Sequence, residues 1–433
     1  MSLLASVALG ETDPALSGTL TAAKETVSIL GNAGATLSTD VFFPRDAGGG
    51  VDAAAIPCPV ILLGHGFAQS KGNHTNQGLQ FASRGYITLI PNFAGGSDHS
   101  RNADDLLKCL DWIIARNADA ASPYHGAVRV ARVGVTGHSA GGMSAIVAAS
   151  RDARIRAVAP MDPVDNASLG ANALSSVAVP VAITYSEPSL CNSSGSAAML
   201  YAAAQAHKRG IKIVGANHTD PQDPAGALST ITCGAASTAR QTLYRRYVTG
   251  WFDYYLRADP GAAPWVFDLA GGQAANDLAA ARITYARTPP ASAVAEWSAT
   301  QFGMNTAIAG LMADPDGDGI PNVTEYALAL DPLAPSRSGL PVASLIPAAG
   351  GTFLAITFTR ATMATDAVIT VEVSPDLAVW TPGSTYAAAG STPNTASTTE
   401  VAHTGLGIET IVVRDNAPVA TSPRFMRLRI TLP

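Results

Sequence analysis

The fold is decided by the stretch Val130-Ala-Arg-Val-Gly-Val-Thr136, which leads into Gly137-His138-Ser139-Ala140-Gly141-Gly142 and then into an alanine-rich helical pattern. A G-x-S-x-G sequence between a strand and a helix is typical of a nucleophile elbow, a strained turn that presents a serine above the edge of a sheet. Glycines allow the close backbone approach that this turn needs, and a helix N-terminus favours negative charge beside it. The sequence therefore predicts Ser139 as a nucleophile; a glycine-rich turn with a capping serine is the alternative.

Short apolar runs alternate with helical patterns on both sides of this turn, between about residues 38 and 258. Continuous apolar strands separated by helices indicate a mostly parallel sheet covered on both faces, with functional residues in the loops at the carboxyl ends of its strands. The expected strands are Pro59–Gly64, Tyr86–Pro91, Val130–Thr136, Ile155–Pro160, Val179–Tyr185 and Ile211–Gly215, and the expected helices are Asn76–Arg84, Ala103–Arg116, Ala140–Ser150, Ala197–Arg209 and Thr238–Arg257.

An oxyanion hole is expected between two of these loops. Acyl transfer needs two backbone N–H groups directed at the oxygen that becomes negatively charged. The residue after the nucleophile, Ala140, supplies one of them, and the loop Gly64-His65-Gly66-Phe67 after an earlier strand supplies the other, most plausibly from Phe67.

The general base is expected to be His218, in the loop after the strand Ile211–Gly215. Where a nucleophile elbow lies on such a parallel sheet, the three catalytic residues occur along the chain in the order serine, acid, histidine. That order eliminates five of the eight histidines, namely His65, His74, His99, His125 and His138. His207 ends a predicted helix and His403 lies in the β-rich C-terminal part, so His218 remains; a structural loop histidine bonded to a nearby aspartate is the alternative.

Three carboxylates compete for the role of the acid that orients the histidine. Asp162 and Asp165 follow the strand Ile155–Pro160, and Glu187 follows the next strand. Both loops lie at the same end of the sheet, so topology alone does not choose between them. Asp162 is favoured because it is nearest to the end of its strand.

The motifs HGF, GHSAGG, MDPVD and GANH, in this order, resemble those of α/β-hydrolases near the chlorophyllases and platelet-activating-factor acetylhydrolases, and more distantly of cutinase-like polyester hydrolases. The resemblance covers about residues 38–258 and implies Ser139 as nucleophile, Asp162 as acid and His218 as base. It implies an α/β-hydrolase fold. Two departures concern the substrate pocket: Ala140 stands where chlorophyllases have arginine, and no aromatic residue follows the acid where cutinase-like enzymes have tryptophan.

Composition limits the alternatives for the whole chain. Its 433 residues suggest two or three domains, and a hydrophobic content of 47% allows a large core. Lys and Arg number 27 against 33 Asp and Glu, and this net charge of −6 argues against a nucleic-acid-binding protein and against a polybasic membrane anchor. No apolar run approaches the roughly 18 residues of a membrane-spanning helix.

The four cysteines, Cys58, Cys109, Cys191 and Cys233, show no zinc-binding spacing. An even number suggests disulfides, with three possible pairings. We favour Cys191–Cys233, because both residues lie in loops expected at one end of the sheet; buried free thiols are the alternative.

An acidic segment, Leu311–Leu333, has five acidic residues and no lysine or arginine, so that it accounts for nearly all of the chain's net charge. Its spacing fits the calcium loop D-x-D-x-D-G-x5-E. Calcium prefers six to eight oxygen ligands, and the expected set is Asp314, Asp316, Asp318, the carbonyl of Ile320, Asn322 and Glu325. This loop resembles dockerin-like single calcium loops of secreted bacterial proteins; a solvated acidic turn is the alternative.

The sequence after about residue 339 has strand-like runs separated by polar turns, which favours a small β-sandwich. These runs are Thr352–Arg360, Ala367–Val373, Glu409–Val413 and Phe425–Leu432. The predicted organisation is a catalytic α/β-hydrolase domain over residues 1–287, a linker over 288–310, a calcium-binding segment over 311–333 and an accessory β-sandwich over 334–433.

The expected function is that of a serine carboxylic-ester hydrolase, cutinase-like or acting on polyesters, with a Ser-His-Asp triad and an acyl-enzyme. The expected location is that of a bacterial-type protein that is secreted or lies at the cell surface or in the periplasm. We expect no cofactor for catalysis, a structural calcium ion, an ester substrate that is either small or polymeric, and no nucleic-acid partner. A lipase or an acyl-polysaccharide esterase is an alternative activity. A catalytically inactive hydrolase scaffold that serves in binding or adhesion is an alternative of another class.

Overall fold

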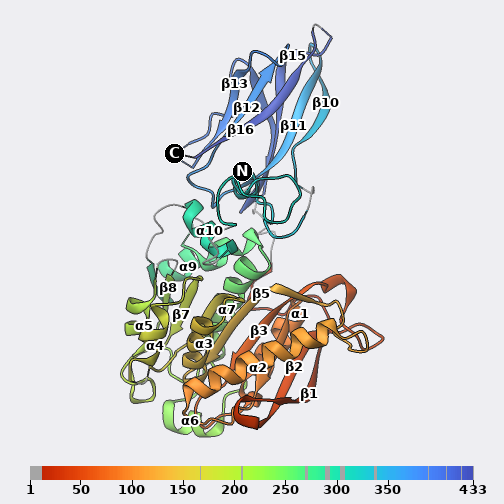
Figure 1. The fold of residues 1–433 in the computed structure, drawn as a ribbon. Helices are drawn as coiled ribbons and strands as arrows, with labels where there is room; N and C mark the ends of the chain where they lie inside the picture. The colour runs from red at the N-terminus through yellow and green to blue at the C-terminus, as the bar shows by residue number, and fades with distance from the viewer. Residues whose placement is uncertain are drawn as a thin grey trace. The chain divides into compact units, whose positions relative to one another are not determined.

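The computed structural model describes residues 12–165, 167–205, 208–268, 272–287, 293–302, 308–335, 339–388, 390–405, 407–420 and 422–432. These residues form two compact units, one within residues 12–289 and the other within residues 290–433 (Figure 1). The predicted boundaries at residues 1, 288 and 433, and residues 288–292 and 303–307 of the predicted linker, lie outside the described residues.

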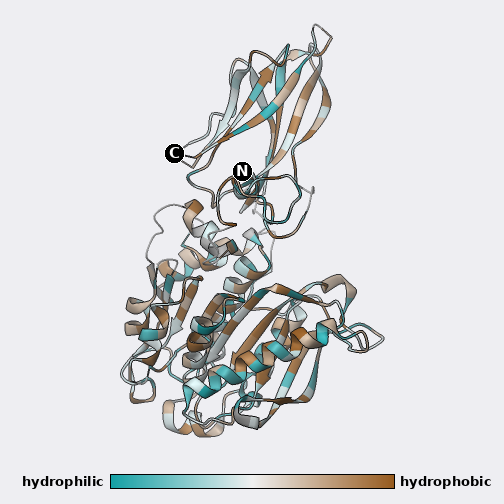
Figure 2. Ribbon diagram, in the orientation of Figure 1, coloured by the Kyte–Doolittle hydropathy of each residue, from teal (hydrophilic) through white to brown (hydrophobic). Residues whose placement is uncertain are grey.

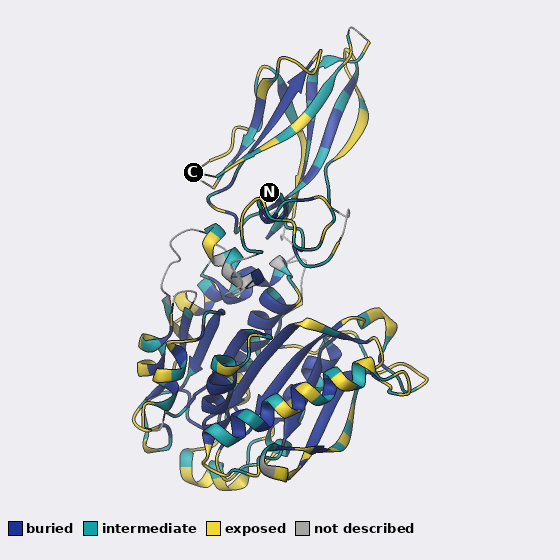
Figure 3. Ribbon diagram, viewed as in Figure 1, coloured by how far each residue is buried: buried dark blue, intermediate teal, exposed yellow. Residues whose placement is uncertain are grey.

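The first unit is built on a nine-stranded sheet with the order β1-β2-β4-β3-β5-β6-β7-β8-β9. Its strands are β1 (Ala22–Leu30), β2 (Thr36–Pro44), β3 (Cys58–Gly64), β4 (Ile87–Pro91), β5 (Val128–His138), β6 (Ile155–Met161), β7 (Val181–Tyr185), β8 (Lys208–Ile213) and β9 (Ile283–Arg287). Strands β3 to β8 run parallel to one another, whereas β1, β2 and β9 are antiparallel to their neighbours. The central strands are buried on both faces, and most of their residues are apolar (Figures 2 and 3).

Helices cover both faces of this sheet. They are α1 (Thr75–Ser83), α2 (His99–Ala118), α3 (Ala140–Arg151), α4 (Leu169–Leu174), α5 (Ala197–Ala203), α6 (Ala227–Cys233), α7 (Thr238–Leu256), α8 (Ala263–Val266) and α9 (Gln273–Ala279). Val133 and Val135 of β5 belong to the core that includes α2 and α3. Gly134, between them, faces α7: a Cβ atom there would lie 2.7 Å from side-chain atoms of Phe252 and Leu256, so that only glycine allows this close packing.

The predicted parallel sheet with helices on both faces is confirmed. The short helices α4, α6, α8 and α9 were not predicted, and there are three further differences. The expected helix Ala197–Arg209 is wrong in its second half, because α5 ends at Ala203 and Lys208 already pairs with Val181 of β7. The hairpin of β1 and β2 and the edge strand β9 were not predicted. β1 alternates between more and less exposed residues, as is usual for an antiparallel strand with one solvated face, and therefore has no continuous apolar run.

The second unit contains two antiparallel sheets, in the orders β10-β11-β15-β14 and β13-β12-β16. Its elements are α10 (Ala293–Phe302), α11 (Asn322–Leu328), β10 (Val342–Ala348), β11 (Gly351–Ala361), β12 (Val368–Ser374), β13 (Thr381–Tyr386), β14 (Thr398–Thr404), β15 (Ile408–Pro418) and β16 (Phe425–Thr431). Apolar residues of both sheets share one core, as in a β-sandwich, and α11 packs against it. β10, β13 and β14 were not predicted.

Helix α10 lies within the segment that was expected to be a linker. Its Trp297 ring lies 5.3 Å from that of Tyr326 in α11 and 5.5 Å from that of Phe302, centroid to centroid. Alanine favours the helical conformation, and the contact of Trp297 with Tyr326 packs this helix against α11. No helix among the described residues is both long and apolar enough to cross a membrane.

Candidate active site

Ser139 lies in a sharp turn between β5 and α3. Its φ of +55° is in the left-handed region, which costs free energy for a residue with a side chain. The turn is tight because α3 begins directly against the end of β3: a Cβ atom on Gly141 would lie 2.1 Å from the carbonyl oxygen of Gly64. Strand, turn and helix therefore have the geometry of a nucleophile elbow.

His218 lies between Ser139 and Asp162, in the loop after β8. Its Nε2 is 2.9 Å from Oγ of Ser139, and its Nδ1 is 2.6 Å from Oδ2 of Asp162. An ionised carboxylate only accepts hydrogen bonds, so Nδ1 carries the proton and Nε2 of the neutral ring accepts the serine O–H. All three residues are buried. This arrangement can take the proton from a serine hydroxyl as it attacks an electrophile.

Of the three competing carboxylates, Asp162 is the one that contacts His218. Asp162 follows β6 with a φ of +43°, and its N–H donates to the carbonyl of Thr184 in β7. The carboxylate of Glu187 instead pairs with Lys212 at 3.1 Å and is 40% exposed. The carboxylate of Asp165 accepts hydrogen bonds from the N–H groups of Gly170 and Ala171.

Two polar residues that the sequence reasoning missed also contact Asp162. Ser186 donates from its backbone N–H to Oδ1 at 3.1 Å and from its hydroxyl to Oδ2 at 2.5 Å. Asn192 is fully buried, and its Nδ2 lies 3.4 Å from Oδ2 of Asp162. Ser186 directly follows β7, so the rule that strand ends hold functional residues could have indicated it. Asn192 lies in a short 3-10 helix (Leu190–Asn192), where it forms a capping box with Ser189, and it belongs to none of the catalytic motifs.

The two expected oxyanion donors lie on adjacent loops. Ala140 begins α3, so its N–H is among the helix-terminal amides that have no partner within the helix. Phe67 lies in a turn that is closed by a hydrogen bond from Gln69 N–H to Gly66 O, which does not use the Phe67 N–H. The side chain of Phe67 is 63% exposed.

His65 fixes the loop that contains Phe67. Its Nε2 accepts a hydrogen bond from Phe93 N–H at 3.0 Å, so its Nδ1 carries the proton and donates to Gly66 O at 2.9 Å. Burial lowers the pKa of His65 from its usual value. A neutral ring in this tautomer matches both hydrogen bonds.

A second buried histidine, His138, packs on the ring of His218 with a centroid distance of 4.6 Å. Burial, and then the neighbouring His218 and His74, hold the pKa of His138 well below its usual range. The pKa of His74 falls to about 4, chiefly through burial. These rings therefore stay uncharged near neutral pH and add no positive charge that would oppose protonation of His218. Among the other candidates, His207 lies outside the described residues, and His403 lies between Glu400 and Glu409 in the second unit.

The predicted disulfide Cys191–Cys233 is confirmed. It joins the 3-10 helix that contains Asn192 to α6, and α6 is the helix that follows the loop of His218 in the sequence. Cys58 and Cys109 are buried free thiols, and burial raises the pKa of each to about 12.

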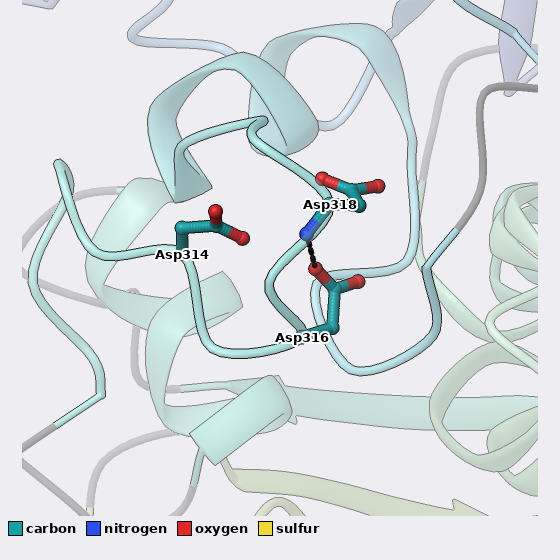
Figure 4. Close-up of side chains that lie close together, drawn as sticks. All are labelled: Asp314, Asp316 and Asp318. Carbon is teal, nitrogen blue, oxygen red and sulfur yellow. Dashed lines mark hydrogen bonds between the residues drawn. The ribbon is translucent and has the colours of Figure 1, made fainter.

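The acidic loop lies in the second unit and leads into α11. Carboxylate oxygens of Asp314, Asp316 and Asp318 lie within 4.8 Å of one another, and Asp318 N–H donates to Asp316 (Figure 4). Gly317, between Asp316 and Asp318, and Gly319, after Asp318, have φ values of +77° and +89°, which glycine adopts at no steric cost and which allow the loop to turn here.

Three oxygen atoms of the expected calcium ligands are buried without a hydrogen-bond partner: Oδ2 of Asp316, Oδ1 of Asn322 and Oε2 of Glu325. The amide nitrogen of Asn322 donates to the carbonyls of Ile308 and Gly310, which leaves its oxygen available. Burial, and then the carboxylates of Asp316 and Asp318, raise the pKa of Glu325 to about 8. Unpaired buried oxygens among clustered acids are what a hard cation would satisfy, so these residues fit a calcium ion.

A family model described as PET hydrolase-like matches residues 12–235, just over half of the chain. The matched range includes Ser139, Asp162, His218 and the disulfide. No curated protein matches the chain.

Proposed function

The chain belongs to the PET hydrolase-like family, a family of ester hydrolases of the α/β-hydrolase type, and on this premise we propose that it is a serine carboxylic-ester hydrolase that acts on polyesters. The observation that supports this proposal most is the continuous hydrogen-bonded chain from Ser139 through His218 to Asp162. Three side chains from three separate loops align in the order that acyl transfer requires.

In the proposed acylation step, Oγ of Ser139 attacks the ester carbonyl carbon while Nε2 of His218 takes the hydroxyl proton. Asp162 accepts a hydrogen bond from Nδ1–H and stabilises the positive charge that develops on the ring. The N–H groups of Phe67 and Ala140 hold the oxyanion. The C–O bond to the leaving alcohol then breaks, and His218 returns the proton to that oxygen, which leaves an acyl-enzyme on Ser139.

In the proposed deacylation step, His218 takes a proton from a water molecule as its oxygen attacks the acyl-enzyme carbonyl. A second tetrahedral oxyanion forms against the same N–H groups. It collapses with release of the carboxylic acid, and the proton on His218 returns to Oγ of Ser139. This sequence uses only residues of the chain and water.

An apolar polymeric substrate is supported by exposed side chains in the loops that contain the site residues. Phe67 precedes α1, Leu190 lies next to the disulfide at 97% exposure, and Leu228 and Ile231 of α6 are 60% and 83% exposed. None of the seven residues of α6 is buried (Figure 3). The Cys191–Cys233 disulfide joins the segment of Leu190 to α6, and neighbouring exposed apolar groups commonly mark a contact surface.

We further propose an extracellular location and a structural calcium ion. A disulfide such as Cys191–Cys233 persists in oxidising surroundings outside the cytosol. The calcium ion would be held by Asp314, Asp316, Asp318, the carbonyl of Ile320, Asn322 and Glu325, and would supply the positive charge that the buried oxygens of this loop lack. We also propose the domain boundaries predicted from the sequence, with a catalytic domain over residues 1–287 and an accessory domain over residues 334–433.

The proposed activity is tested with Ser139→Ala in the full chain. We expect hydrolysis of p-nitrophenyl butyrate and of a polyester film to fall to background, with an unchanged melting temperature. A fluorophosphonate should label the wild-type protein and leave Ser139→Ala unlabelled. Retained turnover in the variant would refute the serine mechanism, and absence of labelling and turnover in the wild type would favour an inactive scaffold.

A further inference from the structure

The acid and the base of the triad come from strands that are not neighbours. Asp162 follows β6 and His218 follows β8, and β7 lies between these two strands in the sheet. The first residue after β7 is Ser186, which is 1% exposed. Any residue at this point of the sheet edge lies beside the carboxylate that must reach across to the histidine.

Ser186 contacts both oxygens of that carboxylate. Its N–H donates to Oδ1 and its hydroxyl donates to Oδ2, the oxygen that also accepts Nδ1–H of His218. Two donors from one residue fix the rotation of the carboxylate about its terminal bond, a torsion that is otherwise broad. With this rotation fixed, Oδ2 points at His218.

Asn192 fixes the hydroxyl of Ser186 in turn. Its Nδ2 lies 3.0 Å from Oγ of Ser186 and 2.9 Å from the carbonyl oxygen of Glu187. The amide orientation is determined, because Oδ1 accepts the N–H groups of Ser189 and Gly195. Since Nδ2 donates to Oγ of Ser186, the hydroxyl acts as a donor in turn, and Oδ2 of Asp162 at 2.5 Å is a much nearer acceptor than the carbonyl of Glu187 at 3.4 Å.

We propose that Ser186 and Asn192 are positioning residues that act on the reaction through Asp162, by holding its carboxylate in the orientation that His218 needs. This inference rests on the proposed function, since it assigns a role to residues behind the same triad. Ser186 and Asn192 are 1% and 0% exposed and contact the carboxylate of Asp162, so both are expected to act without touching the substrate. Their loss therefore affects kcat and leaves KM unchanged.

Ser186→Ala removes the hydroxyl donor and keeps the backbone N–H donor. We expect kcat for p-nitrophenyl butyrate to fall about 10- to 100-fold, as is usual when a hydrogen bond to a buried charge is lost. Ser186→Thr keeps the hydroxyl and should recover kcat to within a few-fold of wild type. Asn192→Asp replaces the donor by a second carboxylate beside Asp162, and should lower kcat at least as much as Ser186→Ala.

A purely structural role predicts different results, and two comparisons separate the roles. Ser83→Ala is the matched control, because Ser83 is a buried serine of the same unit whose hydroxyl donates to a backbone carbonyl away from the triad. It should lower the melting temperature and leave kcat unchanged. In the Asp162→Asn background, adding Ser186→Ala should lower kcat no further, because residues that act through one another are not additive.

The outcomes separate this inference from the proposed function. If Ser139→Ala retains turnover, the proposed function is wrong and this inference is lost with it. If Ser139→Ala is inactive but Ser186→Ala keeps kcat within twofold, only the positioning role is overturned. Additive losses in the double variant also overturn it. Should Ser186→Ala lose its cooperative melting transition, the same criteria apply to Asn192→Asp, with Ser186→Thr as the control that retains the hydroxyl.

Discussion

The two units of the chain each contain a buried cluster around a carboxylate, and the clusters differ in how their oxygens are satisfied. Both oxygens of Asp162 accept hydrogen bonds from protein donors, namely Ser186 and His218. Glu325 and Asp316, in the acidic loop, each keep a buried oxygen without such a partner. A buried carboxylate is costly unless its oxygens are paired. The first cluster is therefore complete with protein atoms alone, whereas the second requires a cation, as we propose.

The largest expected effect on activity follows from removing the charge of Asp162, the carboxylate of the first cluster. Asp162→Asn should lower kcat by about 10⁴-fold, the size of loss known for the same change in another Ser-His-Asp enzyme, because an amide does not stabilise the required tautomer and charge of the histidine. Steady-state hydrolysis of p-nitrophenyl butyrate measures this loss.

Glu187→Gln is the matched control for that variant. Glu187 follows the neighbouring strand and pairs with Lys212 at the surface, so kcat should remain within about twofold of wild type, because exposed ion pairs contribute little. A large loss in Glu187→Gln together with a small one in Asp162→Asn would reverse the assignment of the acid.

A smaller effect, on stability, is expected when the Cys191–Cys233 disulfide near the first cluster is removed. Replacing both Cys191 and Cys233 by serine opens a connection between residues 42 apart in sequence. The expected cost is about 3–4 kcal/mol of unfolding free energy, from the greater entropy of the unfolded chain. Denaturant unfolding measures it, and reduced wild-type protein should unfold at the same denaturant concentration as the double variant. Equal stability of the oxidised wild type and the variant would contradict the expectation.

The second cluster is tested by adding and removing calcium. At a concentration 100 times its Kd, a ligand that binds only the folded state stabilises it by about 2.7 kcal/mol. For a unit of this size, that corresponds to a rise in melting temperature on the order of 10 °C. Calorimetry with calcium and with a chelator should show this shift in one of two transitions, while hydrolysis of a soluble ester by the unit of residues 12–289 stays the same.

Glu325→Gln sharpens the same test. It replaces a buried carboxyl group, whose Oε2 has no hydrogen-bond partner, by an amide of the same shape, so the chelated variant should melt no lower than chelated wild type and should lose its response to calcium. Glu409→Gln is the control, because Glu409 pairs with Arg360 outside the loop, and this variant should keep the response. An unchanged response in Glu325→Gln would argue that this loop is not the site.

The comparison also explains how far the sequence could predict each region. Ser139 and the acidic loop are recognisable because local spacing alone defines them, within about a dozen residues. The acid could not be chosen with certainty, because Asp162, Asp165 and Glu187 end neighbouring strands, and the choice depends on a backbone φ of +43° that no sequence pattern specifies. Ser186 and Asn192 were missed because hydrogen bonding in the folded protein, and not spacing, defines their contact with Asp162.

The same reasoning applies to the fold. Buried parallel strands have continuous apolar runs and were predicted close to their observed positions. β1 and β9 lie at the edges of the sheet and have mixed exposure, so their sequences resemble those of loops. Lys208 and Arg209 were assigned to a helix on local pattern, and pairing of β8 with β7 overrode that preference.

The smallest expected effect concerns the exposed apolar side chains near the complete cluster. Ile231→Ser removes an 83% exposed side chain of α6 and should leave kcat and KM for p-nitrophenyl butyrate unchanged, because a small ester needs no extended contact surface. On a polyester film the variant should release soluble product a few-fold more slowly, since burying one such side chain contributes about 1.5–3 kcal/mol at most and an open surface buries it only in part. Leu345→Ser is the matched control, a 60% exposed side chain on β10 of the other unit. If Leu345→Ser slows film hydrolysis and Ile231→Ser does not, contact with the polymer is made by the accessory unit and not by the loops around Ser139.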